Sequence, residues 1–233
     1  MYGITFNGKH SYNDFGCYIE SKTIQSPAKK KVKIDVPGIN GSYDFSTVNS
    51  NGEITYGTRE ITIKFGFKAM NRQLLYVKYS KILAWLIDVG KSTLIFDDIK
   101  DYYFVAEVEA SSSFEDFRRI GKMEIKFVAD PFKTSIDYQG LFIWNTFNFY
   151  EDIVQDVDFN VVGTKTVSIY NAGRLITPTI NVDATMSVIV GGVTYNLIVG
   201  DNKIYGLKLQ NGYNSIDISG SGNIKFRFKK VKL

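Results

Sequence analysis

Residues 60–68 read EITIKFGFK, and their alternation decides the fold class. Every second position carries a large apolar side chain, while the positions between are polar or small: Ile61, Ile63, Phe65 and Phe67 are the apolar ones. Because successive side chains of a strand point to opposite faces, the pattern predicts a half-buried antiparallel strand. The same period of two recurs at residues 32–36, 104–108, 123–127 and 224–228. Aromatic residues make up 15% of the chain, which also favours a mainly β fold.

One segment has a different period. From Asn71 to Val89 the apolar residues recur every three or four positions, which is typical of one face of an amphipathic helix: Leu75, Tyr79, Ile82, Leu86 and Val89. Asn71 can cap the start of this helix, and Gly90 is a candidate C′ residue. Trp85 lies beside the stripe, and we expect it in the core or at a subunit contact. The sequence therefore predicts one α-helix packed against a sheet.

The order of these patterns divides the chain into two domains. The stretch IFDDIKDYY carries three aspartates between two strand patterns, which predicts a hairpin over residues 93–108. The pattern breaks at ADPFKTS, residues 129–135, and beyond it short β runs alternate with glycine turns. Turns about ten residues apart are typical of a small sandwich. We predict a β-rich domain with sheet, helix and hairpin over residues 1–130, and an all-β sandwich over residues 131–233.

Composition excludes several classes of function. The 28 cationic and 24 anionic residues of this 233-residue chain give a mixed surface rather than a nucleic-acid footprint. One cysteine and one histidine exclude Cys/His zinc sites and histidine-based catalytic triads, and a lone cysteine suits a reducing compartment. We expect no catalytic residue, metal or cofactor. The start, MYGITFNGKH, predicts no secretory signal, and we expect no membrane insertion.

Residues 34–46 read IDVPGINGSYDFS and concentrate turn-forming residues between two strand patterns. Pro37 fixes its own φ and lacks an N–H, while Gly38 and Gly41 can adopt a positive φ without a side-chain clash. The sequence predicts a sharp turn here, with Tyr43 and Asp44 just beyond it. Such a loop can cradle a phosphate, bind a metal or dock a partner, and composition and spacing leave the three open.

Aromatic residues of the second domain raise a ligand-binding hypothesis. Trp144, with Tyr205 or Tyr213, can present ring faces to a pyranose, although a core or domain-interface position is the other interpretation of Trp144. The corresponding function is a carbohydrate-binding module that recognises cell-wall sugars. Lysines 29–31, continued by Lys33, can contact phosphates, but no aromatic residue interleaves them. An exposed charged strand that discourages edge-to-edge pairing is the favoured interpretation.

Taken in order, several stretches resemble the N-terminal domain of the distal tail proteins of long-tailed bacteriophages. They are FNG at 6–8, FGCYIES at 15–21, the turn at Ser26 and Pro27, KKVKIDV running into PGINGSYDFS over 30–46, REITIKFGF at 59–67, the helix, the IFDD hairpin, and MEIKF at 123–127 before ADPF. NAGRLITPTINV at 171–182 and the run at 209–230 resemble the C-terminal galectin-like sandwich of the same family. The resemblance therefore covers essentially the whole chain.

This resemblance implies a ring-forming belt domain followed by a galectin-like or CBM-like β-sandwich. It implies a structural protein, not an enzyme, whose six copies form a ring that joins the tail tube to the baseplate or tail fibre and serves as an assembly hub for host adhesion. The implied partners are other copies, the tail tube protein, a tail-associated lysin or tail fibre protein, and a receptor-binding or baseplate protein; DNA only passes through the channel. The implied location is the virion tail tip, after synthesis in the host bacterial cytoplasm.

Within such a ring we expect residues 37–45 at a subunit or tube contact. A rigid turn loses little conformational freedom on assembly, and the residues concerned are Pro37, Gly38, Gly41, Tyr43 and Asp44. We also expect lysines 29–31 to lie away from the channel wall or to be offset there by carboxylates, because a strongly basic lining would hold DNA phosphates.

Overall fold

The computed structural model describes residues 2–50, 52–117, 119–140 and 153–233. It divides into two compact units, of which the first is Met1–Lys133 with Leu233 and the second is Thr134–Lys232. Each unit encloses a hydrophobic core of its own. In the part of the chain that the structure describes, no helix is both long and apolar enough to cross a membrane.

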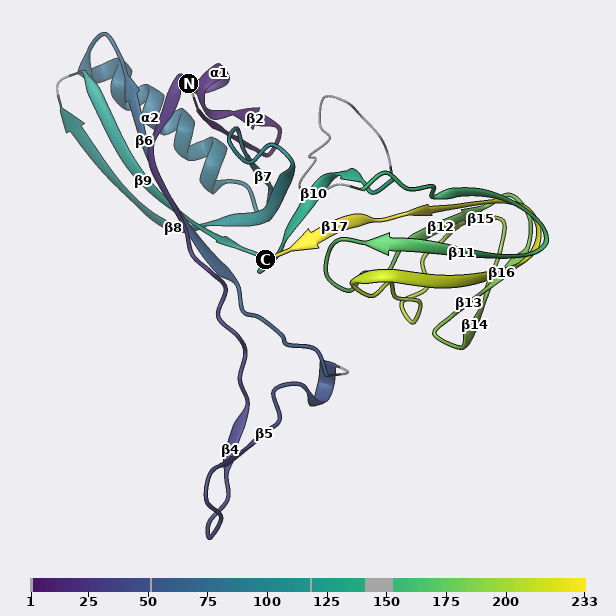
Figure 1. Cartoon of the computed structure of the whole chain (residues 1–233). Coiled ribbons are helices and arrows are strands. Elements are labelled where there is room, and N and C mark those ends of the chain that lie inside the picture. Colours follow the sequence, from purple (N-terminus) through teal and green to yellow (C-terminus); the bar gives the residue numbers. More distant parts are fainter. Residues whose placement is uncertain (1, 51, 118, 141–152) are drawn as a thin grey trace. The chain divides into compact units, whose positions relative to one another are not determined.

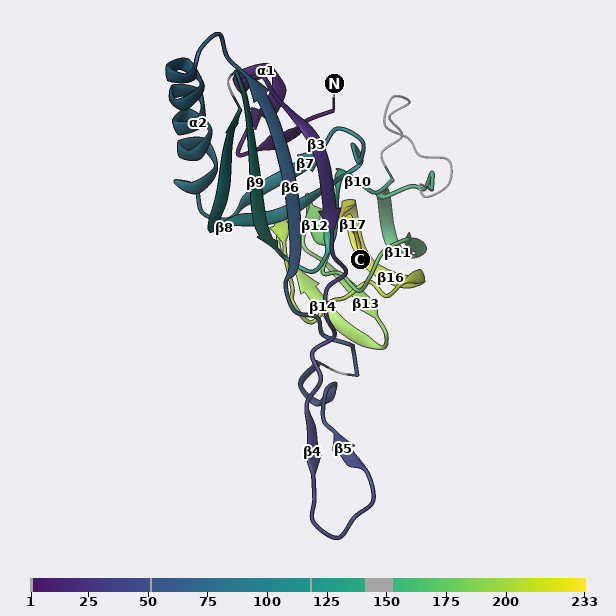
Figure 2. The same cartoon turned by 90° about the vertical axis from the view of Figure 1, so that its left-hand side faces the viewer.

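The first unit combines one antiparallel sheet with two helices and a separate small hairpin (Figures 1 and 2). Its elements are β1 (Ile4–Phe6), β2 (Lys9–His10), α1 (Ser11–Phe15), β3 (Cys17–Ile24), β4 (Lys33–Asp35), β5 (Ser42–Asp44), the 3₁₀ turn η1 (Val48–Ser50), β6 (Arg59–Lys68), α2 (Arg72–Ile87), β7 (Ser92–Phe96), β8 (Tyr102–Phe117) and β9 (Ile120–Ala129). The strands pair in the order β2-β1-β7-β8-β9-β6-β3, and β4 pairs with β5. Helix α2 packs against β8 and β9 (Figure 2).

The alternation of β6 builds the core of this unit. Its four large apolar residues are buried, and β9 places Phe127 opposite Ile61, and Ile125 opposite Ile63. The polar residues of both strands occupy the other face of the sheet. This confirms the predicted half-buried strand. Strands β7 and β8 pair antiparallel on either side of residues 97–101, which confirms the predicted hairpin.

Helix α2 begins where the sequence predicts. The side chain of Asn71 accepts a hydrogen bond of 2.8 Å from the backbone N–H of Leu74. Leu75, Ile82 and Leu86 of the predicted stripe are buried in the core. The helix ends at Ile87, two residues earlier than the pattern indicates.

Two details at the end of α2 refine the prediction. Trp85 is buried in the core, and its Nε1 donates a hydrogen bond of 2.9 Å to the carbonyl of Phe6. The assignment of Gly90 as the C′ residue is wrong. Asp88 is the C-cap residue, with φ of −75°, and the helix has already ended before the chain reaches Gly90.

The short helix α1 is an addition that the sequence does not predict, because five residues are too few to show a helical period. His10 caps it: its Nδ1 accepts hydrogen bonds from the backbone N–H groups of Tyr12 and Asn13. At the other end Gly16 has φ of 59°, a left-handed conformation that ends the helix. The Nε2 of His10 lies 3.1 Å from a carboxylate oxygen of Asp97, so one side chain joins α1 to the β7–β8 turn.

The described residues of the second unit form strands and no helix, which confirms the predicted mainly β fold class. Its strands are β10 (Lys133–Tyr138), β11 (Asp158–Asn171), β12 (Thr179–Val182), β13 (Met186–Val190), β14 (Val193–Leu197), β15 (Gly200–Asn202), β16 (Gly212–Arg227) and β17 (Lys229–Lys232). The long β16 pairs with β11 along one edge; along its other edge residues 216–219 pair with β13 and residues 224–227 with β12. Strands β14 and β15 extend these two pairings, and β10 pairs with β17.

Candidate functional site

Residues 28–48, called the arm here, continue the pairing of β3 with β6 (Figure 1). Beyond those strands the backbone of Gln25 donates to Glu60, and that of Lys30 donates to Thr55 at 2.9 Å. The arm then narrows to the β4–β5 hairpin, in which Ile34 faces Tyr43 and Lys33 faces Asp44. Every residue from 28 to 45 is exposed. Among the described residues, the backbone hydrogen bonds that join the arm to the rest of the first unit lie at its base.

The hairpin of the arm is amphipathic. Because directly opposed residues of a ladder share a face, one face carries only large apolar side chains and the other is polar. We call the first the apolar arm face, and it comprises Val32, Ile34, Val36, Tyr43 and Phe45. These side chains are between 38% and 52% exposed. The period of two at residues 32–36 predicts a buried face, yet a single chain buries neither face of this hairpin.

The structure separates the predicted arm residues into a turn and two faces. Gly38 and Gly41 have φ of 85° and 88°, the positive values that the sharp turn requires. Tyr43 lies on the apolar arm face beside Phe45, with 6.3 Å between ring centroids. Asp44 lies on the polar face, where hydrogen bonds from Ser46 hold the pKa of its carboxyl below its ordinary value. The alternation at residues 32–36 already predicts that Val32, Ile34 and Val36 share one face of a strand. Tyr43 lies on the same face of the hairpin, opposite Ile34.

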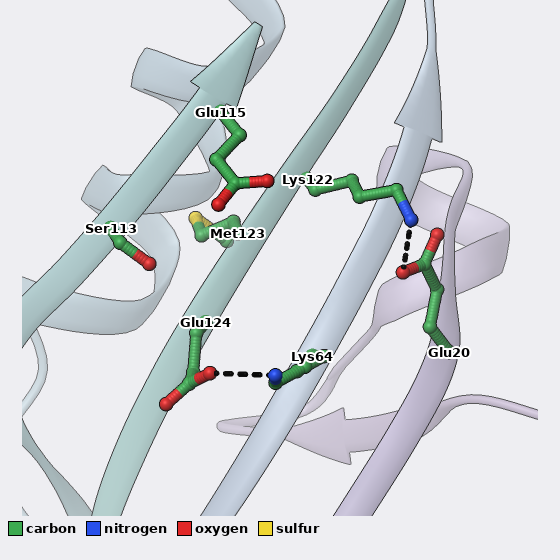
Figure 3. Close-up of a pocket in the computed structure, with 7 residues that line it drawn as sticks. All are labelled: Glu20, Lys64, Ser113, Glu115, Lys122, Met123 and Glu124. Carbon is green, nitrogen blue, oxygen red and sulfur yellow. Dashed lines mark ion pairs between the residues drawn. The ribbon is translucent and has the colours of Figure 1, made fainter. Parts of the chain in front are cut away.

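The first unit also has a charged sheet face, shown in Figure 3. A hollow of about 260 Å³ there is lined by three glutamates and two lysines, with Ser113 and Met123. Lys122 Nζ lies 3.0 Å from Glu20, and Lys64 Nζ lies 3.3 Å from Glu124 (Figure 3). The hydrogen bond that the Lys122 ammonium donates to the Glu20 carboxylate raises the pKa of Lys122. Both lysines that line this hollow are therefore matched by carboxylates.

Two of the three sugar-binding candidates, Tyr205 and Tyr213, lie among the described residues of the second unit. Trp144 lies outside the described residues. Tyr205 and Tyr213 are 77% and 78% exposed, and Tyr213 lines a hollow of about 490 Å³ at the start of β16 whose lining does not include Tyr205. The ring of Tyr213 makes a T-shaped contact with the ring of Tyr170, the residue opposite it on β11. The distance between the two ring centroids is 4.9 Å.

The thiol of Cys17 is buried in the core of the first unit. Burial raises the pKa of the Cys17 thiol to about 12, so it stays protonated in the core. Within the described ranges, no three or more His, Cys, Asp or Glu side chains are arranged to hold a metal ion. The features that remain are surfaces suited to binding: the apolar arm face, the charged sheet face and the hollow at Tyr213.

Comparison with known proteins agrees with this architecture. Residues 8–129, more than half of the chain, match the family model of the phage tail protein RIFT-related domain, Sipho_tail. Among curated protein sequences no match is found. The chain is similar to the crystal structure of the Dit protein of phage SPP1, with a TM-score of 0.68 and 13% identity, over 98% of this chain and 99% of that chain.

The SPP1 protein is described as a paradigm of the hub adsorption apparatus in phages that infect Gram-positive bacteria. At 13% identity this likeness concerns the fold, and it extends across both units. The family match and the shared fold confirm the resemblance to distal tail proteins that the sequence motifs indicate. The chain belongs to the phage tail protein RIFT-related domain family and is a structural tail protein of a siphophage with the Dit fold.

Proposed function

We propose that six copies of this chain form a closed ring at the tail tip, where the ring joins the tail tube to the baseplate or tail fibre and acts as the hub for host adhesion. Its partners in this role are other copies, the tail tube protein, and a tail-associated lysin, tail fibre, receptor-binding or baseplate protein. The protein is made in the host cytoplasm and then incorporated into the virion. DNA meets it only while passing through the ring.

The observation that carries this proposal is the apolar arm face. An isolated two-stranded hairpin is at best marginally stable in water, and a contiguous exposed apolar patch marks an interaction surface. Five large side chains of the arm form such a patch, and nothing in the described chain covers it. A partner that buries this face stabilises the arm as well as the complex. We assign the neighbouring copy as that partner.

Ring closure sets the kind of contact that the arm must make. A closed ring of identical copies uses a head-to-tail contact, in which one patch meets a different patch on the next copy. An arm that continues a sheet edge can reach such a patch, while the rest of its unit stays folded on its own core. The turn at Gly38 and Gly41 fixes the hairpin register, so Tyr43 meets the neighbour with little loss of conformational freedom.

Passage of DNA adds an electrostatic requirement. A wall with unmatched cations would release counterions and hold phosphates tightly. The charged sheet face satisfies this requirement because Lys64 and Lys122 are each paired with a glutamate. Lysines 29–31 belong to the arm instead, and in this proposal they lie away from the channel or opposite carboxylates of the ring. A ring structure in which these lysines crowd an otherwise neutral pore would contradict this part of the proposal.

A double substitution in the turn tests the role of the arm. A Cβ atom added at Gly38 or Gly41 meets no atom within 4 Å, so Gly38→Val with Gly41→Val strains only the positive-φ backbone. The matched control is Gly163→Val in β11, which has φ of 79° and equally open surroundings. Electron microscopy and solution mass are measured for each purified protein, alone and mixed with the tail tube protein. We expect rings from the wild type and the control, and none from the double variant.

The interpretation of each result is direct. A double variant that keeps the wild-type circular dichroism and melting curve but loses rings supports the arm contact. A folded double variant that assembles as the wild type does would refute the arm contact. Loss of assembly in Gly163→Val would place the important contact on the second unit instead.

A further inference from the structure

The hollow at Tyr213 is built from four parts of the second unit. The β13–β14 turn supplies Val190 and Gly191, strand β14 supplies Tyr195, and the segment before β16 supplies Lys208 and Gln210. The first residues of β16 complete it. It is an open surface hollow of about 490 Å³, larger than the hollow on the charged sheet face.

Hydrogen bonds hold the wall of this hollow in place. The hydroxyl of Tyr195 donates to the carbonyl of Gly206 at 2.9 Å. The side chain of Asn214, called the clamp here, bonds to the backbone of the segment before β16. Its Oδ1 accepts a hydrogen bond of 2.8 Å from the N–H of Gln210. Its Nδ2 donates hydrogen bonds of 2.9 Å to the carbonyls of Gln210 and Gly212. The segment that carries Lys208 is therefore ordered before any ligand arrives, which lowers the entropic cost of binding.

The ring of Tyr213 provides an apolar platform at the edge of the hollow. It is 78% exposed although it sits on a strand, and its edge-to-face contact with Tyr170 fixes its orientation. An aromatic ring has an apolar face and, in tyrosine, a polar tip that can hydrogen-bond. A sugar matches this combination because its ring presents C–H groups on one side and hydroxyls at its edge.

The polar groups of the hollow define the charge of the ligand. Within the part of the chain that the structure describes, the side chains of Lys208, Gln210 and Ser215 form no hydrogen bond or ion pair. They supply donors and acceptors to a ligand without breaking a contact within the protein. Lys208 carries the only charge among the lining residues. An ammonium group with no carboxylate in the same hollow favours an anionic ligand.

We propose that this hollow binds an anionic saccharide, a sugar that carries a phosphate or carboxylate. Tyr213 stacks on the sugar ring, Gln210 and Ser215 hydrogen-bond its hydroxyls, and Lys208 pairs with its anionic group. This inference goes beyond the proposed ring, because each copy would carry its own saccharide site on the second unit. A ring of copies would then bind a repetitive surface polymer with multivalent affinity.

Heteronuclear NMR on the full chain tests the proposal, with glucose 1-phosphate as the probe and glucose and inorganic phosphate as separate titrants. We expect glucose 1-phosphate to shift resonances of residues 190–191 and 206–215, and to bind more tightly than either of the others. Tyr213→Ala should weaken binding by about tenfold, the effect of losing one aromatic contact. Lys208→Gln should remove the preference for the phosphorylated sugar over glucose and leave glucose binding unchanged.

Tyr205→Ala is the matched control, since Tyr205 is as exposed as Tyr213 and lies outside the hollow. Both substitutions replace surface tyrosines, so the fold should persist, and the proton–nitrogen spectrum of each free variant reports this directly. Shifts confined to other parts of the chain, or equal losses in Tyr205→Ala and Tyr213→Ala, would overturn the assigned site. Inorganic phosphate binding as tightly as glucose 1-phosphate would overturn the saccharide assignment, and no binding at millimolar probe would overturn both.

Discussion

Removing two central side chains of the apolar arm face should weaken self-assembly without unfolding the protein. The substitution is Ile34→Ser with Tyr43→Ser, which removes the one directly opposed apolar pair of the β4–β5 ladder. Both residues are already about half exposed in the single chain, at 49% and 52%. Surface substitutions of this kind usually change the free energy of unfolding by less than about 0.5 kcal/mol. Any large effect must therefore come from the assembled state.

The size of that effect follows from the exposed fraction. Fully burying a side chain of this size contributes about 1.5–3 kcal/mol, so burying the exposed half contributes about 1 kcal/mol for each residue. The pair therefore contributes about 2 kcal/mol to each contact, which corresponds to about a thirtyfold change in its dissociation constant. Because a closed ring needs every contact at once, the protein concentration at which rings appear should rise by at least that factor.

Sedimentation velocity over a hundredfold concentration range measures this shift. The control is Val162→Ser with Ile198→Ser, which removes two apolar side chains that are 84% and 71% exposed on the second unit. We expect the control to assemble at wild-type concentrations. Unchanged assembly of the arm variant, or an equal shift in the control, would refute the reasoning that the arm face is buried between copies.

Three further predictions concern the two cores. Trp85→Phe leaves the carbonyl of Phe6 without its donor and should lower the unfolding free energy of the first unit by about 1–3 kcal/mol in a denaturant titration. Gly173→Ala places a Cβ atom 2.7 Å from the backbone nitrogen of Val231 and should cost the second unit about 1–3 kcal/mol, seen as a selective shift of its melting transition. The unfolded Cys17 thiol ionises near pH 9.0 and the folded one near 12, so the folded state retains the proton and its stability falls as pH rises between these values. Cys17→Ala should flatten that part of the stability curve, and equal slopes for both proteins would contradict the burial of the thiol.

Local patterns predicted the core of the first unit well. The period of two in β6 and the helical stripe of α2 both follow from side-chain direction, which depends only on neighbouring residues. Asn71 caps α2 for the same local reason. The short helix α1 was missed because five residues show no helical period, and the side chain of its cap, His10, also contacts Asp97 far along the chain. A contact across 87 residues leaves no local signal.

Strand pairing in the second unit was beyond the reach of local patterns. The sequence predicts short β runs between glycine turns, but one continuous strand, β16, joins three of the others. Gly220 and Gly222 lie between its two pairings, where a Cβ atom would come within 3 Å of Met186 or Asp183. Residues 219–223, SGSGN, have the composition of a turn, yet they lie within β16. Close packing of the strand against its neighbours is what requires glycine there.

Local sequence patterns also could not predict which candidate residues form a binding site. Tyr205 and Tyr213 are equally exposed, and composition alone does not favour either residue as the platform for a sugar ring. Only the fold distinguishes them, because Lys208 and Gln210 are brought to the side of Tyr213 by the clamp at Asn214. A binding site depends on which loops meet, and that is decided by long-range pairing.

The arm is the case in which the sequence pattern and the single chain disagree. Residues 32–36 alternate as strictly as β6 does, and this alternation is typical of a strand with one face in a core. Helix α2 also carries apolar residues outside the core. Leu74, Tyr76 and Val77 are exposed, although the opposite face of the helix already fills the core. Exposed apolar faces of this kind promote aggregation unless a partner covers them. In the proposed ring a surface of the neighbouring copy covers the apolar arm face, which would explain why residues 32–36 alternate although the single chain leaves them exposed.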